Sequence, residues 1–116
     1  MSIQSGNDLS ALKRVGKAVA ATLREMLRRV RPGMTTAELD KIGAAVLARY
    51  GARSAPKTVY GFPADTCISV NDQAAHGVPG ARVIKSGDVV NIDVSAELGG
   101  YYADTGETIA LRPVSE

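Results

Sequence analysis

The strongest constraint on the fold is a stretch near the C-terminal end where apolar and polar residues alternate. The apolar positions are Val90, Ile92 and Val94, and the polar positions between them are Asn91, Asp93 and Ser95. Strict alternation is typical of a β-strand with one buried and one wet face. Glycines at 99 and 100 then supply a turn. The sequence therefore predicts a β-hairpin over residues 88–105.

Two acidic residues, Asp93 and Asp104, fall on the two arms of this hairpin. With a four-residue loop at 97–100 they lie directly opposite each other. With a two-residue loop at 99–100 they become diagonal neighbours on the same face. Close like charges are destabilising, so we expect cations between them, such as two divalent metals about 3.5–4 Å apart. The alternative is a pair of solvated carboxylates on the wet face of the sheet.

The length and composition fit one small globular domain over residues 1–116. Hydrophobic residues make up 45% of the chain and charged residues 22%, values that exclude disordered and low-complexity classes. The sequence contains no apolar stretch of 18 residues and no secretory pattern at its start. We therefore expect a cytoplasmic protein without membrane contact, in which the single cysteine, Cys67, is a reduced thiol.

Two amphipathic helices are predicted in the first half of the chain. Apolar residues recur every three or four positions over residues 8–30, and Pro32-Gly33 ends this pattern. Thr35 and Glu38 form a capping box for a second helix that Gly51 closes. The first helix carries half of the fourteen basic residues, which suits either contact with RNA or a ribosome or simply a solvated helix face.

The segments between these helices and the hairpin are short. Residues 52–63 contain Pro56, Gly61 and Pro63, so an irregular segment is expected there. Residues 66–71 predict a short strand, 74–80 a loop with the only histidine, His76, and 85–88 a turn, while 108–111 extends the second hairpin strand. The expected class is α+β, with two helices packed on one face of a mainly antiparallel sheet.

His76 adds a titratable group to the two carboxylates. It precedes Gly77 and Pro79 in a stiff loop, and an imidazole is suited to hydrogen-bond a reacting carbonyl or amine. Two carboxylates and a nearby imidazole suit metal-assisted hydrolysis.

Four motifs, taken in order and with their spacing, resemble the N-terminal half of type I methionine aminopeptidases. They are CISVN at 67–71, HGVP at 76–79, GDVVNIDV at 87–94 and ADT at 103–105. The resemblance implies a pita-bread fold, in which two pseudo-symmetric halves with a curved sheet hold two divalent metals. Residues 1–116 would be one such half. Prolidase-like proteins share the two aspartates but not the spacing from residues 69–71 to His76, so they are the second candidate family.

The resemblance also implies residue roles. Asp93 would bind one metal and Asp104 would bridge both, while His76 would be catalytic, contacting the substrate rather than a metal. Phe62 and Cys67 would line the pocket for the methionine side chain. Val59 would also lie there, at a position where the family commonly has tyrosine.

The family completes its metal shell with a histidine and two glutamates from the C-terminal half, which residues 1–116 do not supply. We therefore expect weak or no binding of Co²⁺, Mn²⁺, Fe²⁺ or Zn²⁺ by the isolated chain, and weak or absent removal of methionine from peptides or nascent proteins. The alternative is a non-catalytic half-domain that binds proteins or itself. Expected partners are a complementary C-terminal half or a second copy in a homodimer.

Overall fold

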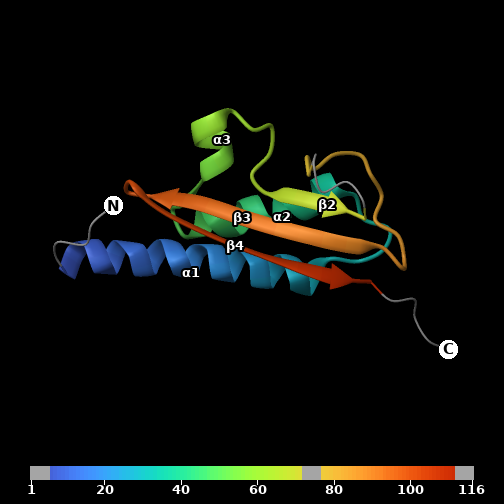
Figure 1. The fold of residues 1–116 in the computed structure, drawn as a ribbon, viewed down its shortest axis with the longest axis horizontal. Coiled ribbons are helices and arrows are strands. Elements are labelled where there is room, and N and C mark those ends of the chain that lie inside the picture. The colour runs from blue at the N-terminus through green and yellow to red at the C-terminus, as the bar shows by residue number, and fades with distance from the viewer. Residues whose placement is uncertain (1–5, 72–76, 112–116) are drawn as a thin grey trace.

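A ten-residue strand, β3 (Val89–Leu98), forms the middle of the molecule in the computed structural model, which describes residues 6–71 and 77–111 (Figure 1). The other elements are α1 (Gly6–Arg29), α2 (Thr36–Arg49), β1 (Arg53–Ser54), α3 (Ala55–Tyr60), β2 (Cys67–Val70) and β4 (Tyr101–Ala110). β4 pairs with β3 along its whole length, and β1 and β2 share the opposite edge of β3. All of these pairings are antiparallel.

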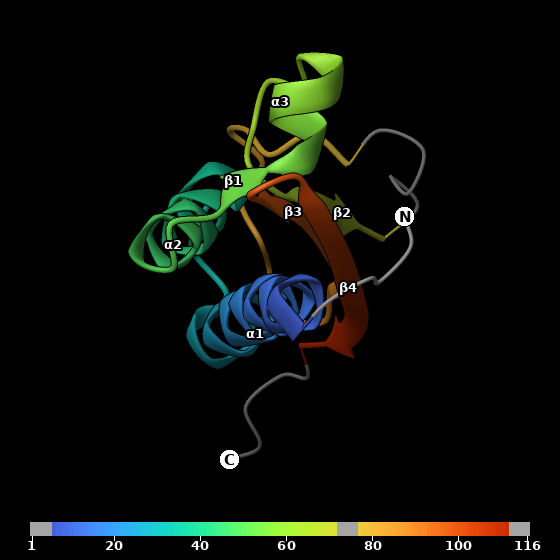
Figure 2. The same cartoon turned by 90° about the vertical axis from the view of Figure 1, so that its left-hand side faces the viewer.

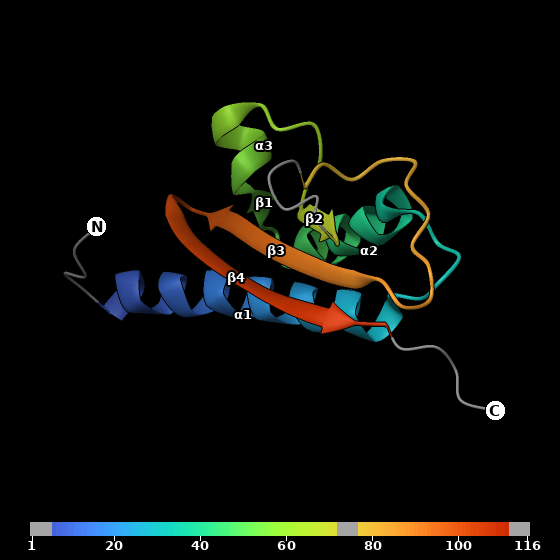
Figure 3. The ribbon, with the colours of Figure 1, turned by 45° about the vertical axis from the view of Figure 1, so that its right-hand side comes forward.

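The alternation in β3 places one face in the core, as the sequence predicts. The side chains of Val90, Ile92, Val94 and Ala96 are completely buried. They pack with apolar residues of α1 such as Val15 and Met26 in one cluster. Full burial of each of the valine and isoleucine side chains contributes about 1.5–3 kcal/mol. This cluster holds the hairpin against α1, which lies along it in Figure 3.

Both long helices cover the same side of the curved sheet, which confirms the predicted arrangement (Figure 2). At the start of α2, the Thr35 hydroxyl accepts the Glu38 N–H at 3.1 Å, and Glu38 Oε1 accepts the Thr35 N–H at 2.9 Å. The predicted capping box is therefore present. Gly51 follows the helix with a φ of +71°. The opposite face of the sheet is left uncovered by α1 and α2.

The prediction of an irregular segment over residues 52–63 is wrong, because residues 53–60 form β1 and α3. Ser54 caps α3 by accepting the Lys57 N–H at 3.2 Å. Pro56 lies in the first turn, where a missing N–H breaks no helical hydrogen bond. Gly61 ends the helix in the left-handed region, with a φ of +67°.

The remaining expectations divide between described and undescribed residues. The turn before the hairpin is confirmed, since the Asp88 N–H donates to the Lys85 carbonyl at 3.1 Å. The loop residues 74–76, His76 included, lie outside the described ranges. Within residues 6–71 and 77–111, no helix has the length and apolar character needed to cross a membrane.

Candidate functional site

The register of the hairpin decides how the two aspartates are related. Leu98 pairs with Tyr101, so the loop is only Gly99-Gly100, both with positive φ, as two-residue hairpin turns require. Asp93 then lies opposite Gly106, and Asp104 lies opposite Ser95. The aspartates are diagonal neighbours on the uncovered face, one of the two arrangements predicted. Diagonal positions are roughly 7–8 Å apart, which leaves room for cations between the carboxylates.

Glu97 fixes this register by joining the turn to β1. Its carboxylate accepts the Gly100 N–H at 2.6 Å and the Arg53 guanidinium at 2.6 and 2.9 Å. The Gly100 hydrogen bond, and then the Arg53 contact, hold the pKa of Glu97 below its ordinary value. Because Glu97 is buried and charged, a slipped register would leave its charge unpaired, which is strongly unfavourable.

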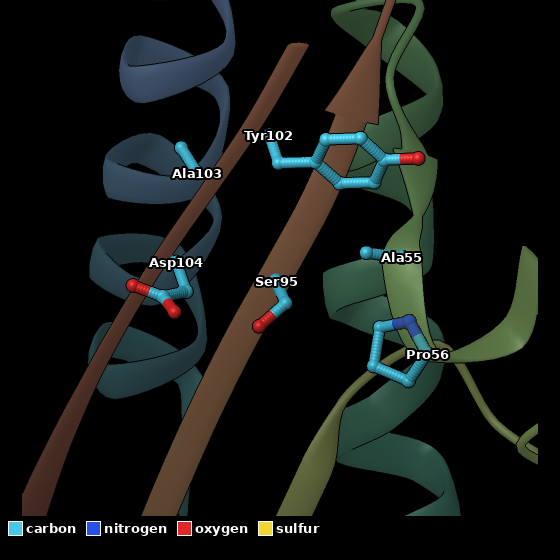
Figure 4. Close-up of a pocket in the computed structure, with 6 residues that line it drawn as sticks. All are labelled: Ala55, Pro56, Ser95, Tyr102, Ala103 and Asp104. Carbon is cyan, nitrogen blue, oxygen red and sulfur yellow. The ribbon is translucent and has the colours of Figure 1, made fainter. Parts of the chain in front are cut away.

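The uncovered face is hollowed on both sides of Asp104. One hollow, of about 340 Å³, is lined by Asp93, Ser95, Asp104, Thr105 and Gly106. The other, of about 300 Å³, is lined by Ala55, Pro56, Ser95, Tyr102, Ala103 and Asp104. Figure 4 shows Ser95 beside Asp104 and the Tyr102 ring extending from β4 across β3 toward Ala55. Asp104 and Ser95 border both hollows, so the two form one depression along the hairpin.

The surroundings of Asp93 come from three strands. The Asn91 amide donates to Asp93 Oδ2 at 2.7 Å. Across the other edge of β3, Cys67 is the register partner of Asp93, so the two side chains leave the sheet on the same face. Burial, and then the negative charge of Asp93, raise the pKa of the Cys67 thiol. The thiol form of Cys67 is thereby favoured over the thiolate, and Cys67 is not among the described residues that line the two hollows.

The other predicted site residues lie apart from the aspartates or outside the described chain. Val59, on α3, is half exposed. Phe62 follows α3 and is partly buried, with its N–H donating to the Pro56 carbonyl at 3.2 Å. Neither belongs to the described residues that line the two hollows. His76 lies in the undescribed segment 72–76.

Sequence reasoning did not assign Ser95, Tyr102 and Gly106 to the site. The period-two alternation continues into β4, where Tyr102, Asp104 and Gly106 are exposed, and it identifies the face. It does not identify which β4 residue lies opposite Asp93, because that depends on the length of the loop.

The donor chemistry fits divalent cations in part. Carboxylate oxygens bind hard and borderline cations, and Asp93 and Asp104 present them on one open face. Two carboxylates offer at most four oxygens, fewer than two cations require. Across residues 6–71 and 77–111, no three His, Cys, Asp or Glu side chains gather closely enough to hold a metal ion. Among the described residues, Asp93 and Asp104 are therefore an acidic pair on an open face and not a complete metal site.

The chain is similar to known proteins in both sequence and fold. The chain is 51% identical over 112 residues to methionine aminopeptidase 2 of Bacillus subtilis, an alignment that covers 96% of the chain and 45% of the relative. The solved methionine aminopeptidase of Thermotoga maritima superposes with a TM-score of 0.88 at 32% identity, over 100% of this chain and 47% of that one. Prolidase from Pyrococcus furiosus shares the fold, with a TM-score of 0.79 at 20% identity, over 98% of this chain and 32% of that one.

These alignments confirm the predicted resemblance to the N-terminal half of methionine aminopeptidases and the α+β pita-bread architecture. The chain spans less than half the length of the methionine aminopeptidases that it matches. Residues 10–116 match the metallopeptidase family M24. The chain therefore belongs to metallopeptidase family M24.

Proposed function

We propose that this chain supplies one half of the active site of a dinuclear metal-dependent aminopeptidase that removes N-terminal methionine from peptides or nascent proteins in the cytoplasm. The observation that carries the proposal is the diagonal placement of Asp93 and Asp104 on the uncovered face of the hairpin. Membership of a metallopeptidase family supports it. So does the 51% identity to a methionine aminopeptidase.

In this proposal the two aspartates hold the cations. Asp93 would be a ligand of one metal, and Asp104, which borders both hollows, would be a ligand shared by both. When bound, Co²⁺, Mn²⁺, Fe²⁺ or Zn²⁺ would polarise the scissile carbonyl and lower the pKa of water. Both carboxylates lie on the open face of the hairpin, where a peptide backbone could reach them.

The remaining residues act on the substrate. His76 hydrogen-bonds the peptide near the scissile bond, as a neutral or charged imidazole can. Cys67 and Phe62 contact the methionine side chain, since sulfur and aromatic rings pack favourably with a thioether. Val59 would lie at the same pocket, where the family commonly has tyrosine, so peptidase activity is expected whether or not selectivity for methionine is strict.

A histidine and two glutamates from outside residues 1–116 complete the metal shell. Alone, residues 1–116 bind cations weakly and hydrolyse peptides slowly or not at all. The free edge of β4 favours assembly with a second half, because β4 pairs only with β3 among the described strands and unpaired edges associate. A complementary half or a second copy of the chain would cover it. The second candidate function, a non-catalytic module that binds proteins or itself, depends on the same edge.

A chimera tests the catalytic proposal. Residues 1–116 would replace the aligned segment of the Bacillus subtilis methionine aminopeptidase 2, and hydrolysis of Met-Ala peptides would be measured with added Mn²⁺ or Co²⁺. We expect turnover that Asp93→Asn or Asp104→Asn abolishes. Asp65→Asn is the matched control, because the Asp65 side chain makes only an exposed contact with Lys57 at 3.5 Å. A folded chimera without turnover contradicts the proposal.

Calorimetry and light scattering distinguish the second candidate. If the chain is a non-catalytic module, light scattering should show that the isolated chain associates at micromolar concentration. Its heat of Mn²⁺ binding should then be the same in the wild-type chain and in the Asp93→Asn/Asp104→Asn double variant. The catalytic proposal predicts that the double variant loses whatever binding heat the wild-type chain shows.

A further inference from the structure

Three polar side chains form a line on the uncovered face, leading from β4 to Asp93. The Thr108 hydroxyl donates to Asn91 Oδ1 at 2.9 Å, and Asn91 Nδ2 donates to Asp93 Oδ2 at 2.7 Å. Thr108 and Asn91 are register partners, and Asn91 and Asp93 are two positions apart on β3, so all three leave the same face of the sheet. The line therefore crosses from one strand to the other and ends at a proposed metal ligand.

The chemistry of the three groups gives this line one direction. An ionised carboxylate only accepts hydrogen bonds, so the nitrogen of the Asn91 amide must face Asp93. The amide oxygen then faces Thr108, whose hydroxyl must donate. The Thr108 hydroxyl therefore selects the orientation of Asn91 that offers Asp93 a donor.

The other oxygen of Asp93 lies over the backbone of β4. A Cβ added to Gly106 would overlap Asp93 Oδ1, so the carboxylate occupies the space that the missing side chain leaves. Asp93 is exposed, and a solvated carboxylate ordinarily samples several rotamers. The Asn91 hydrogen bond restricts one oxygen, and the missing side chain at Gly106 leaves room for the other in this rotamer.

We propose that Thr108 and Asn91 are positioning residues that hold the carboxylate of Asp93 in one rotamer for cation binding. This inference rests on the proposed function, because the purpose of the fixed carboxylate is to bind a metal. Hydrogen-bonded partners of metal ligands orient those ligands, and their loss typically lowers metal affinity 10–100-fold. Here the orienting chain has two members, and its outer member lies on the neighbouring strand.

A purely structural role is a poor account of this line. Thr108 is exposed and Asn91 is half buried, on the side of the sheet opposite the core cluster. Hydrogen bonds there compete with water and add little to folding. Their effect falls on the orientation of Asp93 rather than on the stability of the hairpin.

The test uses residues 1–116 labelled with ¹⁵N and ¹³C, with two readouts. Three-bond couplings without metal report the χ1 rotamer of Asp93, and line broadening by Mn²⁺ reports apparent cation affinity at residues near Asp93 and Asp104. The variants are Thr108→Val, which removes the hydroxyl at constant shape, Thr108→Ser, which restores it, and Asn91→Ala.

The wild-type chain and Thr108→Ser are expected to show one dominant Asp93 rotamer and Mn²⁺ affinities within twofold of each other. Thr108→Val should show averaged couplings and about 3–10-fold weaker affinity, and Asn91→Ala at least 10-fold weaker affinity. Couplings and affinity that are unchanged in both Thr108→Val and Asn91→Ala overturn the positioning role. Broadening that persists in the Asp93→Asn/Asp104→Asn double variant instead overturns the metal site. Where the isolated chain binds Mn²⁺ too weakly to broaden any line, the couplings alone decide whether Thr108 and Asn91 hold Asp93.

Discussion

Replacing Asp40, a buried carboxylate on α2, should be among the most destabilising single changes outside the apolar core. Asp40 Oδ1 accepts the Thr66 N–H at 2.7 Å and the Thr66 hydroxyl at 2.5 Å, and Oδ2 accepts the Asp65 N–H at 3.3 Å. Asp40 is 8% exposed and Thr66 is fully buried. The carboxylate thus ties α2 to the residue that precedes β2, the strand that brings Cys67 beside Asp93.

The structure sets the size of the effect. Asp40→Ala leaves the two buried Thr66 donors without an acceptor, and each such group costs about 1–3 kcal/mol. We expect a loss of about 3–5 kcal/mol from a stability of about 5–15 kcal/mol for a domain of this size. Asp40→Asn keeps an oxygen for both Thr66 donors but loses the charge, so the expected loss is about 1–2 kcal/mol.

Urea denaturation followed by circular dichroism measures both losses, with an m-value of about 1–3 kcal/mol per molar. Asp65→Asn is the control, because it removes only an exposed ion pair worth about 0–1 kcal/mol. If Asp40→Ala falls within about 1 kcal/mol of Asp65→Asn, the Thr66 donors find other partners and the reasoning fails. If Asp40→Asn is as damaging as Asp40→Ala, the negative charge and not the acceptor geometry is what matters.

Three further predictions concern the hairpin. Gly106→Ala should displace the Asp93 carboxylate and weaken Mn²⁺ binding about 10-fold. It should change the urea midpoint little, since the φ of Gly106 is not positive. In an Asp93→Ala background the substitution should have no further effect on either measurement. The pKa of Glu97 is lowered in the folded state, so its charged form stabilises the fold at pH values above its ordinary pKa of 4.5, and this stabilisation is lost as the pH falls through the lowered pKa. The free energy of unfolding, measured in urea at pH 3–6, should therefore fall less steeply with decreasing pH in Glu97→Gln than in the wild-type chain. An equally steep fall would contradict this role. Ile92→Ala should cost about 2–5 kcal/mol, because Ile92 is fully buried; a loss below about 1 kcal/mol in urea would contradict the packing described.

Alternation of residues was enough to predict the faces of the hairpin from the sequence. In β3 every second residue from Val90 to Ala96 is apolar and buried, so the burial in the described structure follows the sequence pattern directly. The capping box of α2 is also a local signal, because both of its hydrogen bonds join residues three apart. Features of this kind depend on residues that are close together in the chain, so they can be predicted from the sequence.

The short helix α3 was missed because Pro56 has opposite meanings at different helix positions. In a helix interior it removes a hydrogen bond, but in the first turn, after the Ser54 cap, it is favourable. A serine before the proline and Gly61 after the segment were the signals available. The two-residue strand β1 has no local signal, since it exists through the contact of Arg53 with Glu97, 44 residues away.

For the candidate site, the face that carries the aspartates could be predicted from the sequence, but their exact positions relative to each other could not. Asp93 and Asp104 could be assigned to one face from their positions in the strands. Whether they are opposed or diagonal depended on the loop, and the positions of Gly106 and Thr108 around Asp93 depended on the register that the loop sets. The Cys67–Asp93 pairing joins β3 to β2, a strand outside the hairpin, so the spacing of residues within the hairpin did not predict it.

The most direct test of the central claim is anomalous diffraction from crystals of the chain grown with Zn²⁺, because it locates the cation without any assay of activity. We predict a zinc peak in the depression of the hairpin, with carboxylate oxygens of Asp93 and Asp104 at about 2.0–2.2 Å, and no such peak in Asp93→Asn/Asp104→Asn. Zinc bound only at other residues, or a peak that survives in the double variant, would contradict it.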